Sequence, residues 1–256
     1  MKRIWGGMVV AAALSGSAFA ADLGARTYTK APAMAAPVTN WSGLYIGGNV
    51  GYGWGNGNTD FMFSPAAESA NATLDTKPKG VIGGAQIGYN WQMGSLLTGL
   101  EADIQGAGIK GTAAPSQIIA TDGGANVVGD FLSSNEKLSW FGTVRGRLGV
   151  TVTPDLLLYA TGGLAYGHVD ASANAHFVNP FDFPGSISKT KAGWTAGAGA
   201  EWMFARNWSA KVEYLYLDLG NVSAIGQSDP FLNVAAAYTW HTQENIVRAG
   251  VNYHFN

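Results

Sequence analysis

Charged side chains stand at alternate positions inside stretches that are otherwise apolar or rich in glycine. Ala102 alone separates Glu101 from Asp103, and a single glycine separates Arg145 from Arg147. Acids and guanidinium groups with this spacing form charge-assisted hydrogen bonds when a fold brings their segments together. Such a set either selects ions or holds a structure together. The full set comprises Glu101, Asp103, Arg145, Arg147, Glu201, Lys211, Glu213, Glu244 and Arg248.

Residues that carry nucleophilic or metal chemistry are scarce. The chain has no cysteine, which excludes disulfides, thiolate catalysis and cysteine metal sites. No serine–histidine arrangement that would activate a nucleophile occurs on one strand face, so we predict that the protein is not an enzyme. His168, His176 and His241 could bind haem iron. Scattered solvated histidines are the simpler interpretation, and neither a cofactor nor a metal site is predicted.

The composition restricts the elements that position these charges. Only 12% of the residues are charged, although 47% are hydrophobic and 36 residues are glycine, whereas an average soluble domain has about 25% charged residues. No uncharged apolar run after residue 20 approaches the length of a membrane helix, roughly 20 residues. The net charge of −2 provides no basic field for nucleic acid. Apolar residues spread over alternating β-strands account for this combination.

Residues 1–20 have the three parts of a secretory signal peptide. Two basic residues precede the apolar segment IWGGMVVAAALSG, and an A-x-A site follows, so cleavage is expected between Ala20 and Ala21. Residues 21–40 are rich in alanine and proline without periodicity, and we interpret them as a flexible periplasmic lead-in. The alternating pattern begins at residue 41, and residues 41–256 are predicted to form one domain.

Eight stretches of this domain alternate with the two-residue period of a β-strand. They are residues 43–55, 80–93, 95–109, 137–152, 155–169, 191–204, 207–220 and 242–255. Short connections at residues 93–95, 153–155 and 205–207 alternate with long ones at 56–79, 110–136, 170–190 and 221–241. Outer membrane barrels have this alternation of short periplasmic turns and long extracellular loops. We predict an all-β, eight-stranded antiparallel transmembrane up-and-down barrel in preference to a soluble β-sandwich.

The barrel prediction assigns a direction to each side chain. Charges at mid-strand cannot face lipid, where each costs about 2–4 kcal/mol, so the charged set is predicted to face the lumen. Eight strands leave a lumen that side chains can fill, which favours a structural polar core over an ion-selective gate. A β-bulge is predicted where tyrosines oppose leucines in 214–219. Aromatics near strand ends are predicted to form interface belts: Trp54, Trp91, Trp140, Tyr166, Trp194, Trp202, Trp208, Tyr253 and Phe255.

The final segment, RAGVNYHFN, is an alternating strand that ends in two aromatics. We interpret it as the strand that closes the barrel. Gly250, Tyr253 and Phe255 resemble the C-terminal signal by which the outer membrane assembly machinery recognises its clients. Asn256 departs from this pattern, since many clients end on the aromatic residue itself.

Several segments taken together resemble one family. They are ADLGARTYTKAP, NWSGLYIGGNVGYGWG, GVIGGAQIGYNWQ, WFGTVRGRLGV, LLYATGGLAYG, KVEYLYLDLG and RAGVNYHF. These segments are similar to small alphaproteobacterial outer membrane β-barrels, the Brucella and rhizobial immunogenic or porin-family surface antigens. The resemblance covers nearly all of the mature chain except the long loops. It implies an eight-stranded barrel in the outer membrane of a Gram-negative bacterium and assigns no loop ligand.

We expect an integral outer membrane protein that supports envelope structure and displays its loops, with a lumen largely plugged by charged residues. Two alternatives stay open: a narrow porin-like channel for small solutes, and a surface haem-binding or adhesion protein. The expected partners are outer membrane lipid, lipopolysaccharide, the barrel assembly machinery, and host or surface ligands that contact the loops. Nucleic acid is not an expected partner.

Overall fold

The computed structural model describes residues 39–64, 71–117, 131–177, 181–227 and 235–255. These residues form ten strands, and none of them forms a helix long and apolar enough to cross a membrane. The signal peptide, its cleavage pair Ala20 and Ala21, and the lead-in up to residue 38 lie outside the described residues. The strands are β1 (Gly43–Gly55), β2 (Asn58–Ser64), β3 (Asn71–Asp75), β4 (Lys79–Met93), β5 (Leu96–Gln117), β6 (Phe131–Thr153), β7 (Leu156–Phe177), β8 (Phe181–Ala205), β9 (Trp208–Gln227) and β10 (Ala235–His254).

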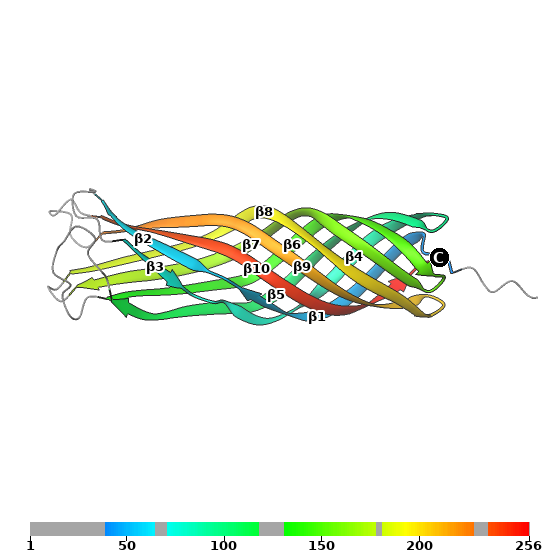
Figure 1. Ribbon diagram of the computed structural model, residues 1–256, viewed down its shortest axis with the longest axis horizontal. Coiled ribbons are helices and arrows are strands. Elements are labelled where there is room, and N and C mark those ends of the chain that lie inside the picture. Colours follow the sequence, from blue (N-terminus) through cyan, green and yellow to red (C-terminus); the bar gives the residue numbers. More distant parts are fainter. Residues whose placement is uncertain (1–38, 65–70, 118–130, 178–180, 228–234, 256) are drawn as a thin grey trace, which may run out of the picture. The chain divides into compact units, whose positions relative to one another are not determined.

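Eight of these strands close a ring. Antiparallel neighbours follow the order β1-β4-β5-β6-β7-β8-β9-β10, and β10 pairs back with β1 from Tyr45↔His254 to Gly55↔Glu244. Figure 1 shows an elongated barrel with the three short turns and the C-terminus at one end. The predicted eight-stranded antiparallel barrel is therefore confirmed. The other end is called the extracellular end below.

The prediction of a loop over residues 56–79 is wrong, because most of this segment is paired. β2 continues the course of β1 along β10, and β3 pairs with β2. Short backbone contacts bridge the interruption: the Gly55 amide donates to the Pro78 carbonyl at 2.8 Å, and the Thr76 amide donates to the Gly57 carbonyl at 2.7 Å. Strands β5 to β10 also extend further into the other long connections than predicted. The barrel wall therefore continues well past the apolar part of the strands.

The three short connections are two-residue turns, as expected. They consist of Gly94-Ser95, Pro154-Asp155 and Arg206-Asn207. Gly94 has a φ of +65°, which a glycine adopts without strain. Tight turns of this kind set the first pairs of the strands that they join. Beside two of the turns the register then shifts, between Thr151 and Thr153 and between Met203 and Ala205.

The predicted β-bulge among residues 214–219 is confirmed at its last residue. Gly220 pairs with Thr242 and Asp218 pairs with Gln243, so Leu219 is the extra residue of β9. Gly220 has a φ of +68°, which a glycine adopts without strain. Leu215, Leu217 and Leu219 are each 1% exposed and face the lumen, while Tyr214 faces outward. The leucines belong to an apolar layer inside the barrel rather than to a displaced outer face.

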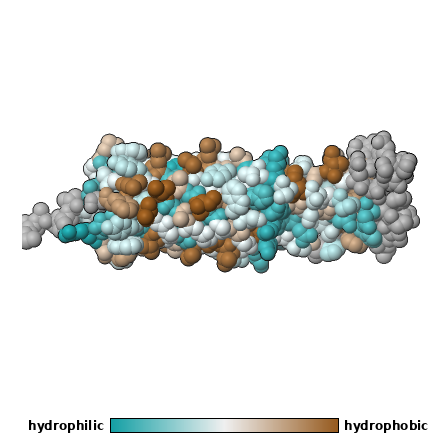
Figure 2. Space-filling view, turned by 180° about the vertical axis from the view of Figure 1, so that it is seen from behind, coloured by the Kyte–Doolittle hydropathy of each residue, from teal (hydrophilic) through white to brown (hydrophobic). Residues whose placement is uncertain are grey.

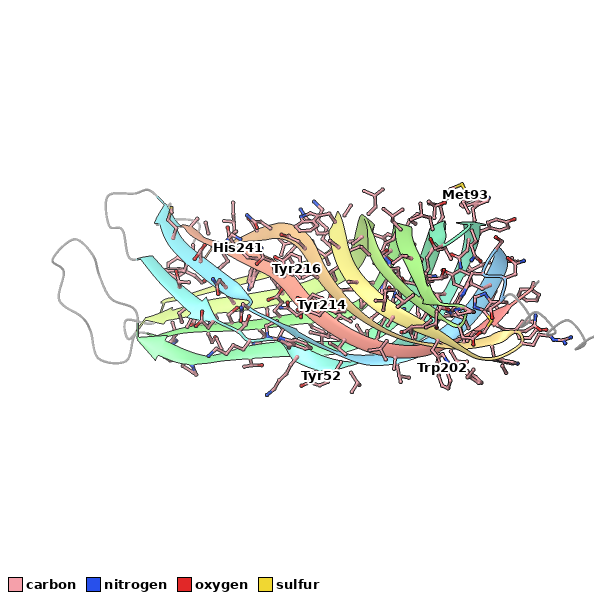
Figure 3. All side chains as sticks on the ribbon, turned by 45° about the vertical axis from the view of Figure 1, so that its right-hand side comes forward. Tyr52, Met93, Trp202, Tyr214, Tyr216 and His241 are labelled. Carbon is pink, nitrogen blue, oxygen red and sulfur yellow. The ribbon has the colours of Figure 1, made fainter. Side chains whose placement is uncertain are left out.

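The outer face carries an apolar band between two aromatic belts. Val50, Val81 and Leu164 are each about 70% exposed, far more than a soluble protein tolerates over a continuous surface. Figure 2 shows hydrophobic residues over much of this wall. In Figure 3, Trp202 lies toward the end with the turns, and Tyr216 lies farther along the barrel. All the predicted belt residues point outward, fully or partly exposed: Trp54, Trp91, Trp140, Tyr166, Trp194, Trp202, Trp208, Tyr253 and Phe255.

Candidate functional site

Eight charged side chains meet in the lumen, and we call them the charge network. Four are carboxylates and four are cations, so their formal charges balance. Every side chain in these ion pairs is 0% exposed. The charge network consists of Glu101, Asp103, Glu201, Glu213, Arg145, Arg147, Lys211 and Arg248.

Strand register places several members of the charge network side by side. Glu101 on β5 is directly opposite Arg145 on β6. Glu201 on β8 is opposite Lys211 on β9, and Glu213 on β9 is opposite Arg248 on β10. All six side chains face the lumen, as predicted for the charged set. Opposite charges in such cross-strand pairs stabilise the sheet.

Glu101 is the centre of the charge network because it forms ion pairs with all four cations. Its carboxylate lies 3.0 Å from Lys211 Nζ and 3.4 Å from Arg248 Nη2, and it is also paired with Arg145. Arg147 Nη1 lies 3.7 Å away. These cations come from β6, β9 and β10, so Glu101 joins opposite walls of the barrel.

Arg145 and Arg248 form a second bridge by sharing two carboxylates. Arg145 lies 3.0 Å from both Asp103 and Glu213. Arg248 lies 3.1 Å from Asp103 and 2.6 Å from Glu213. Thr143 donates its hydroxyl to Asp103 at 2.7 Å. Paired and hydrogen-bonded in this way, the charges meet the condition under which burial is tolerated.

Uncharged polar residues, which were not predicted as part of the site, complete the network. The Tyr45 hydroxyl donates to Glu101 at 2.7 Å and accepts from Arg147 at 2.7 Å. The Arg147 guanidinium lies 3.9 Å from the centre of the Tyr159 ring, a cation–π contact. Their lumen-facing parity was the available signal, but aromatics at these positions are equally common in an apolar core.

Glu201 anchors the network toward the turn end of the barrel. It pairs with Arg147 at 2.6 Å and accepts hydrogen bonds from Ser209 and Asn252, each at 2.6 Å. The Ser209 hydroxyl is also 2.9 Å from His254 Nε2. A continuous chain of polar contacts therefore runs from the centre of the lumen to the last strand.

Trp41 lies inside the barrel on the turn side of the charge network. It is 0% exposed and packs in a cluster with Leu97, Leu157, Tyr159 and Met203. Its indole Nε1 donates to the Pro154 carbonyl at 3.0 Å. This position was not predicted, because a single aromatic before the first strand has no periodicity to give its direction.

An apolar layer lies on the other side of the charge network. The buried side chains of Ile82, Ile109, Leu138, Phe141, Leu215, Leu217, Leu219 and Ile246 belong to one continuous hydrophobic cluster. These residues follow the network along the lumen-facing side of their strands. In β6 that side changes parity at the register shift between Leu138 and Trp140. The lumen is thus layered from apolar, through charged, to apolar again.

Glu244 is not part of the charge network, although it was predicted to belong to one set with the other eight residues. It is 1% exposed and forms no ion pair within the described part of the chain. It lies beside Gly55, while the buried Glu136 lies beside Gly57 and accepts hydrogen bonds from Thr242 and Thr76. The prediction that Glu244 shares the lumen face of β10 with Arg248 is right, but the two side chains lie at different levels along the barrel axis.

The three histidines near the extracellular end do not converge. His168 lies near Asp170 at 3.4 Å, His176 near Asp182 at 2.8 Å, and His241 near Asp60 at 3.1 Å. Within the described ranges no group of three or more His, Cys, Asp or Glu side chains could hold a metal ion.

Two of the aromatics in the predicted long connections lie inside the barrel wall. Phe61 and Phe183 are 2% and 4% exposed, and Phe61 packs against Tyr238 with ring centres 5.6 Å apart. These two rings therefore pack inside the barrel and offer no surface for adhesion.

The proposed assembly residues lie on the last paired segment. Gly250 is opposite Asn49 in the β1–β10 ladder, while Tyr253 and Phe255 are on the outer face with ring centres 5.0 Å apart. Their role in recognition stays a prediction.

Comparison with known proteins identifies the family. The family model of the outer membrane protein beta-barrel domain matches residues 8–255. The 31 kDa outer-membrane immunogenic protein of Brucella melitensis is 37% identical over 96% of this chain and 97% of its own length. The 22 kDa outer membrane protein of Rhizobium leguminosarum is 30% identical over 86% of this chain and 80% of its own. Among solved structures, the outer membrane protease OmpT from Escherichia coli matches with a TM-score of 0.49 and 11% identity, over 82% of this chain and 97% of that one. The family model and the relatives show that the chain belongs to the outer membrane β-barrel family and is a protein of the bacterial outer membrane.

Proposed function

We propose that this protein is a non-enzymatic, closed barrel that reinforces the outer membrane and displays its extracellular extension on the cell surface. The charge network is the observation that carries the proposal. Its acids and cations balance and are fully buried, so no charge is left to attract a passing ion. A selective pore instead needs unpaired charges or carbonyl groups that replace the hydration shell of the ion.

The layers on both sides of the network support the same proposal. On the turn side, Trp41 fills the lumen with its ring against Leu97 and Met203. On the extracellular side, the leucines of β9 pack against Phe141 and Ile109. An ion that crossed would have to shed water at two apolar layers, and hydrophobic constrictions block conduction in this way.

The extracellular extension supports the display function. β7 and β8 stay paired through His176↔Asp182, well beyond the aromatic belt at Tyr166. A rigid wall of paired strands holds its tips away from the membrane surface at a fixed place. This arrangement suits contact with ligands or antibodies outside the cell.

Single-channel recording tests the closed lumen. The mature barrel is refolded in detergent and inserted into a planar bilayer, and heat-modifiable migration on a gel confirms the fold. We expect no discrete current steps from the wild type. The Glu101→Ala/Arg145→Ala variant should stay silent too, since the apolar layers remain. Discrete steps from the folded wild type, altered in this variant, would show a narrow channel and contradict the proposal.

Cysteine labelling tests the display function, because the chain has no native cysteine. Ser186→Cys places a thiol on the exposed part of β8, and Ser95→Cys places one in a turn at the other end. On intact cells, a membrane-impermeant maleimide should label the first variant and not the second. Equal labelling of both, or labelling of Ser95→Cys alone, would refute the orientation.

A further inference from the structure

Three lysines stand side by side on the outer wall of the barrel. Lys79 on β4 is in register with Lys110 on β5, and Lys110 is in register with Lys137 on β6. All three side chains are exposed, and we call them the lysine row. Like charges directly opposite each other destabilise a sheet. The barrel repeats this conflict across two consecutive strand pairs.

The lysine row lies at the extracellular edge of the aromatic belt. Lys79 is in register with Trp54, a belt residue on β1. Lys137 comes three residues before Trp140 on β6, on the extracellular side of it. Belt aromatics mark the boundary between acyl chains and headgroups, so the ammonium groups reach the headgroup layer of the outer leaflet. Figure 2 shows a hydrophilic band across the barrel between its apolar surface and its extracellular end.

The carboxylate in register with the lysine row, that of Asp170, is hydrogen-bonded to serines rather than paired with a lysine. In the described part of the chain, no ion pair joins any of the three lysines to a carboxylate. Asp170 is opposite Lys137 in the β6–β7 register. Its carboxylate instead accepts from Ser188 at 2.6 Å and from Ser139 at 3.0 Å. The ammonium groups of the row thus keep their hydrogen-bond donors for an external anion.

A polar groove adjoins the lysine row. It has a volume of about 460 Å³ and begins at Lys110 and Lys137. The remainder of its lining includes two acidic residues, Glu136 and Asp170, which can accept hydrogen bonds from sugar hydroxyls. It also includes hydroxyl and amide side chains from four neighbouring strands: Thr112, Asn135, Ser172, Ser186 and Ser188. Hydroxyls and amides both donate and accept hydrogen bonds, which matches the hydroxyl-rich surface of a sugar.

We propose that the lysine row binds the phosphate groups of lipopolysaccharide, the anionic glycolipid of the outer leaflet, and that the adjoining groove holds part of its sugar. Phosphate accepts several charge-assisted hydrogen bonds at once, so one phosphate satisfies two neighbouring lysines. Its negative charge also removes the repulsion within the row. This inference depends on the outer membrane location of the barrel and not on whether the lumen conducts. The lipopolysaccharide site and the closed lumen can therefore fail separately.

Binding of diphosphoryl lipid A to the detergent-folded barrel tests the proposal. The row variant is Lys79→Gln/Lys110→Gln/Lys137→Gln. The control variant, Lys189→Gln/Lys191→Gln/Arg206→Gln, removes the same charge from outside the row. Affinity is read from the rise in unfolding temperature with lipid concentration. We expect the row variant to bind roughly tenfold more weakly or worse, and the control variant to bind like the wild type.

Two further ligands show which part of the glycolipid the barrel recognises. Lipid A with both phosphates removed should bind the wild type as weakly as the intact lipid binds the row variant. Inorganic phosphate should raise the unfolding temperature of the wild type little at the same concentration. Three results would each overturn the proposal. The row variant could bind diphosphoryl lipid A as tightly as the wild type does, or the row and control variants could lose the same affinity. The wild type could also bind dephosphorylated lipid A as tightly as the intact lipid. Tight binding of inorganic phosphate would replace the glycolipid with a free anion.

Folding of the variants is checked by heat-modifiable migration. If the triple variant does not fold, Lys110→Gln alone removes the centre of the row. The Lys79→Arg/Lys110→Arg/Lys137→Arg variant keeps the charge and should keep the affinity. A loss of affinity in this arginine variant as large as in the glutamine variant would show that the lysines act through packing rather than charge.

Discussion

Replacing Glu101 with glutamine tests whether the charge network stabilises the barrel as a unit. Glutamine keeps the shape of the side chain but leaves four buried cations with three carboxylates. Removing one partner of a buried ion pair costs about 3–5 kcal/mol, because the other charge stays buried without compensation. Glu101 contacts all four cations, so we expect a loss near the upper end of that range.

A second substitution separates charge imbalance from lost contacts. Glu101→Gln/Lys211→Met restores the balance at three acids and three cations. Neutral replacement of a whole buried pair is often close to neutral, so we expect this variant to lose only about 1–2 kcal/mol relative to the wild type. The double variant should therefore be more stable than Glu101→Gln alone. Additive losses would mean that the two residues act independently.

Equilibrium unfolding in guanidinium chloride provides the measurement. The barrel is folded in lipid vesicles, and its tryptophan fluorescence is followed against denaturant, with the slope of the transition checked for constancy. Asp75→Asn serves as the control, because Asp75 is exposed and should change stability by less than about 0.5 kcal/mol. A loss of unfolding free energy below about 1 kcal/mol for Glu101→Gln would refute the reasoning, because an uncompensated buried charge destabilises a fold by more than that.

Three further predictions use the same unfolding assay. Trp41→Ala should cost about 3–5 kcal/mol, because it leaves a cavity in the cluster at the turn end; a loss within error of zero would place the ring outside that cluster. Gly88→Ala should cost about 1–3 kcal/mol of stability, because a Cβ there would lie 2.3 Å from the Tyr45 ring. In the control Gly48→Ala, the new Cβ meets nothing closer than 3.8 Å, so the change should be nearly neutral. Equal effects of the two substitutions would contradict this packing. Glu244→Gln should leave stability unchanged or raise it, because this buried carboxylate has no cation to lose; a loss as large as that of Glu101→Gln would reveal a partner.

The direction of the charged side chains was predictable from the sequence because a strand has a strict two-residue period. Parity places these side chains on the lumen face, but it does not give their exact partners. A long connection joins β5 to β6, so no turn sets Glu101 opposite Arg145. Glu201 is opposite Lys211 only because the register shifts between Met203 and Ala205. Contacts across the lumen were not predictable in this way. The pairing of Glu101 with Lys211 depends on the diameter and strand tilt of the barrel, which the period alone does not determine.

The misplaced elements have physical reasons as well. In β2 three polar residues precede the uninterrupted apolar run Phe61-Met62-Phe63, and β3 has one large apolar residue, Leu74. The apolar alternation that marks the other strands is therefore weak there. These strands are held by ladders to β10 and to each other rather than by a strong local preference. Glu244 has the parity of Arg248, but its level along the barrel axis depends on tilt, so the sequence pattern grouped it with charges that it does not meet.

The closure of β1 on β10 determines the order in which the barrel can be completed. Every other neighbouring pair in the ring joins strands that follow closely in the chain, but Tyr45↔His254 joins its two ends. Until that ladder forms, β1 and β10 are open edges that can pair with another chain. A circularly permuted chain, opened at Gly94-Ser95 with the old ends joined, would make this closure a local hairpin. The vulnerable edges would then be β4 and β5, and aggregation during assembly would be set by their sequences instead.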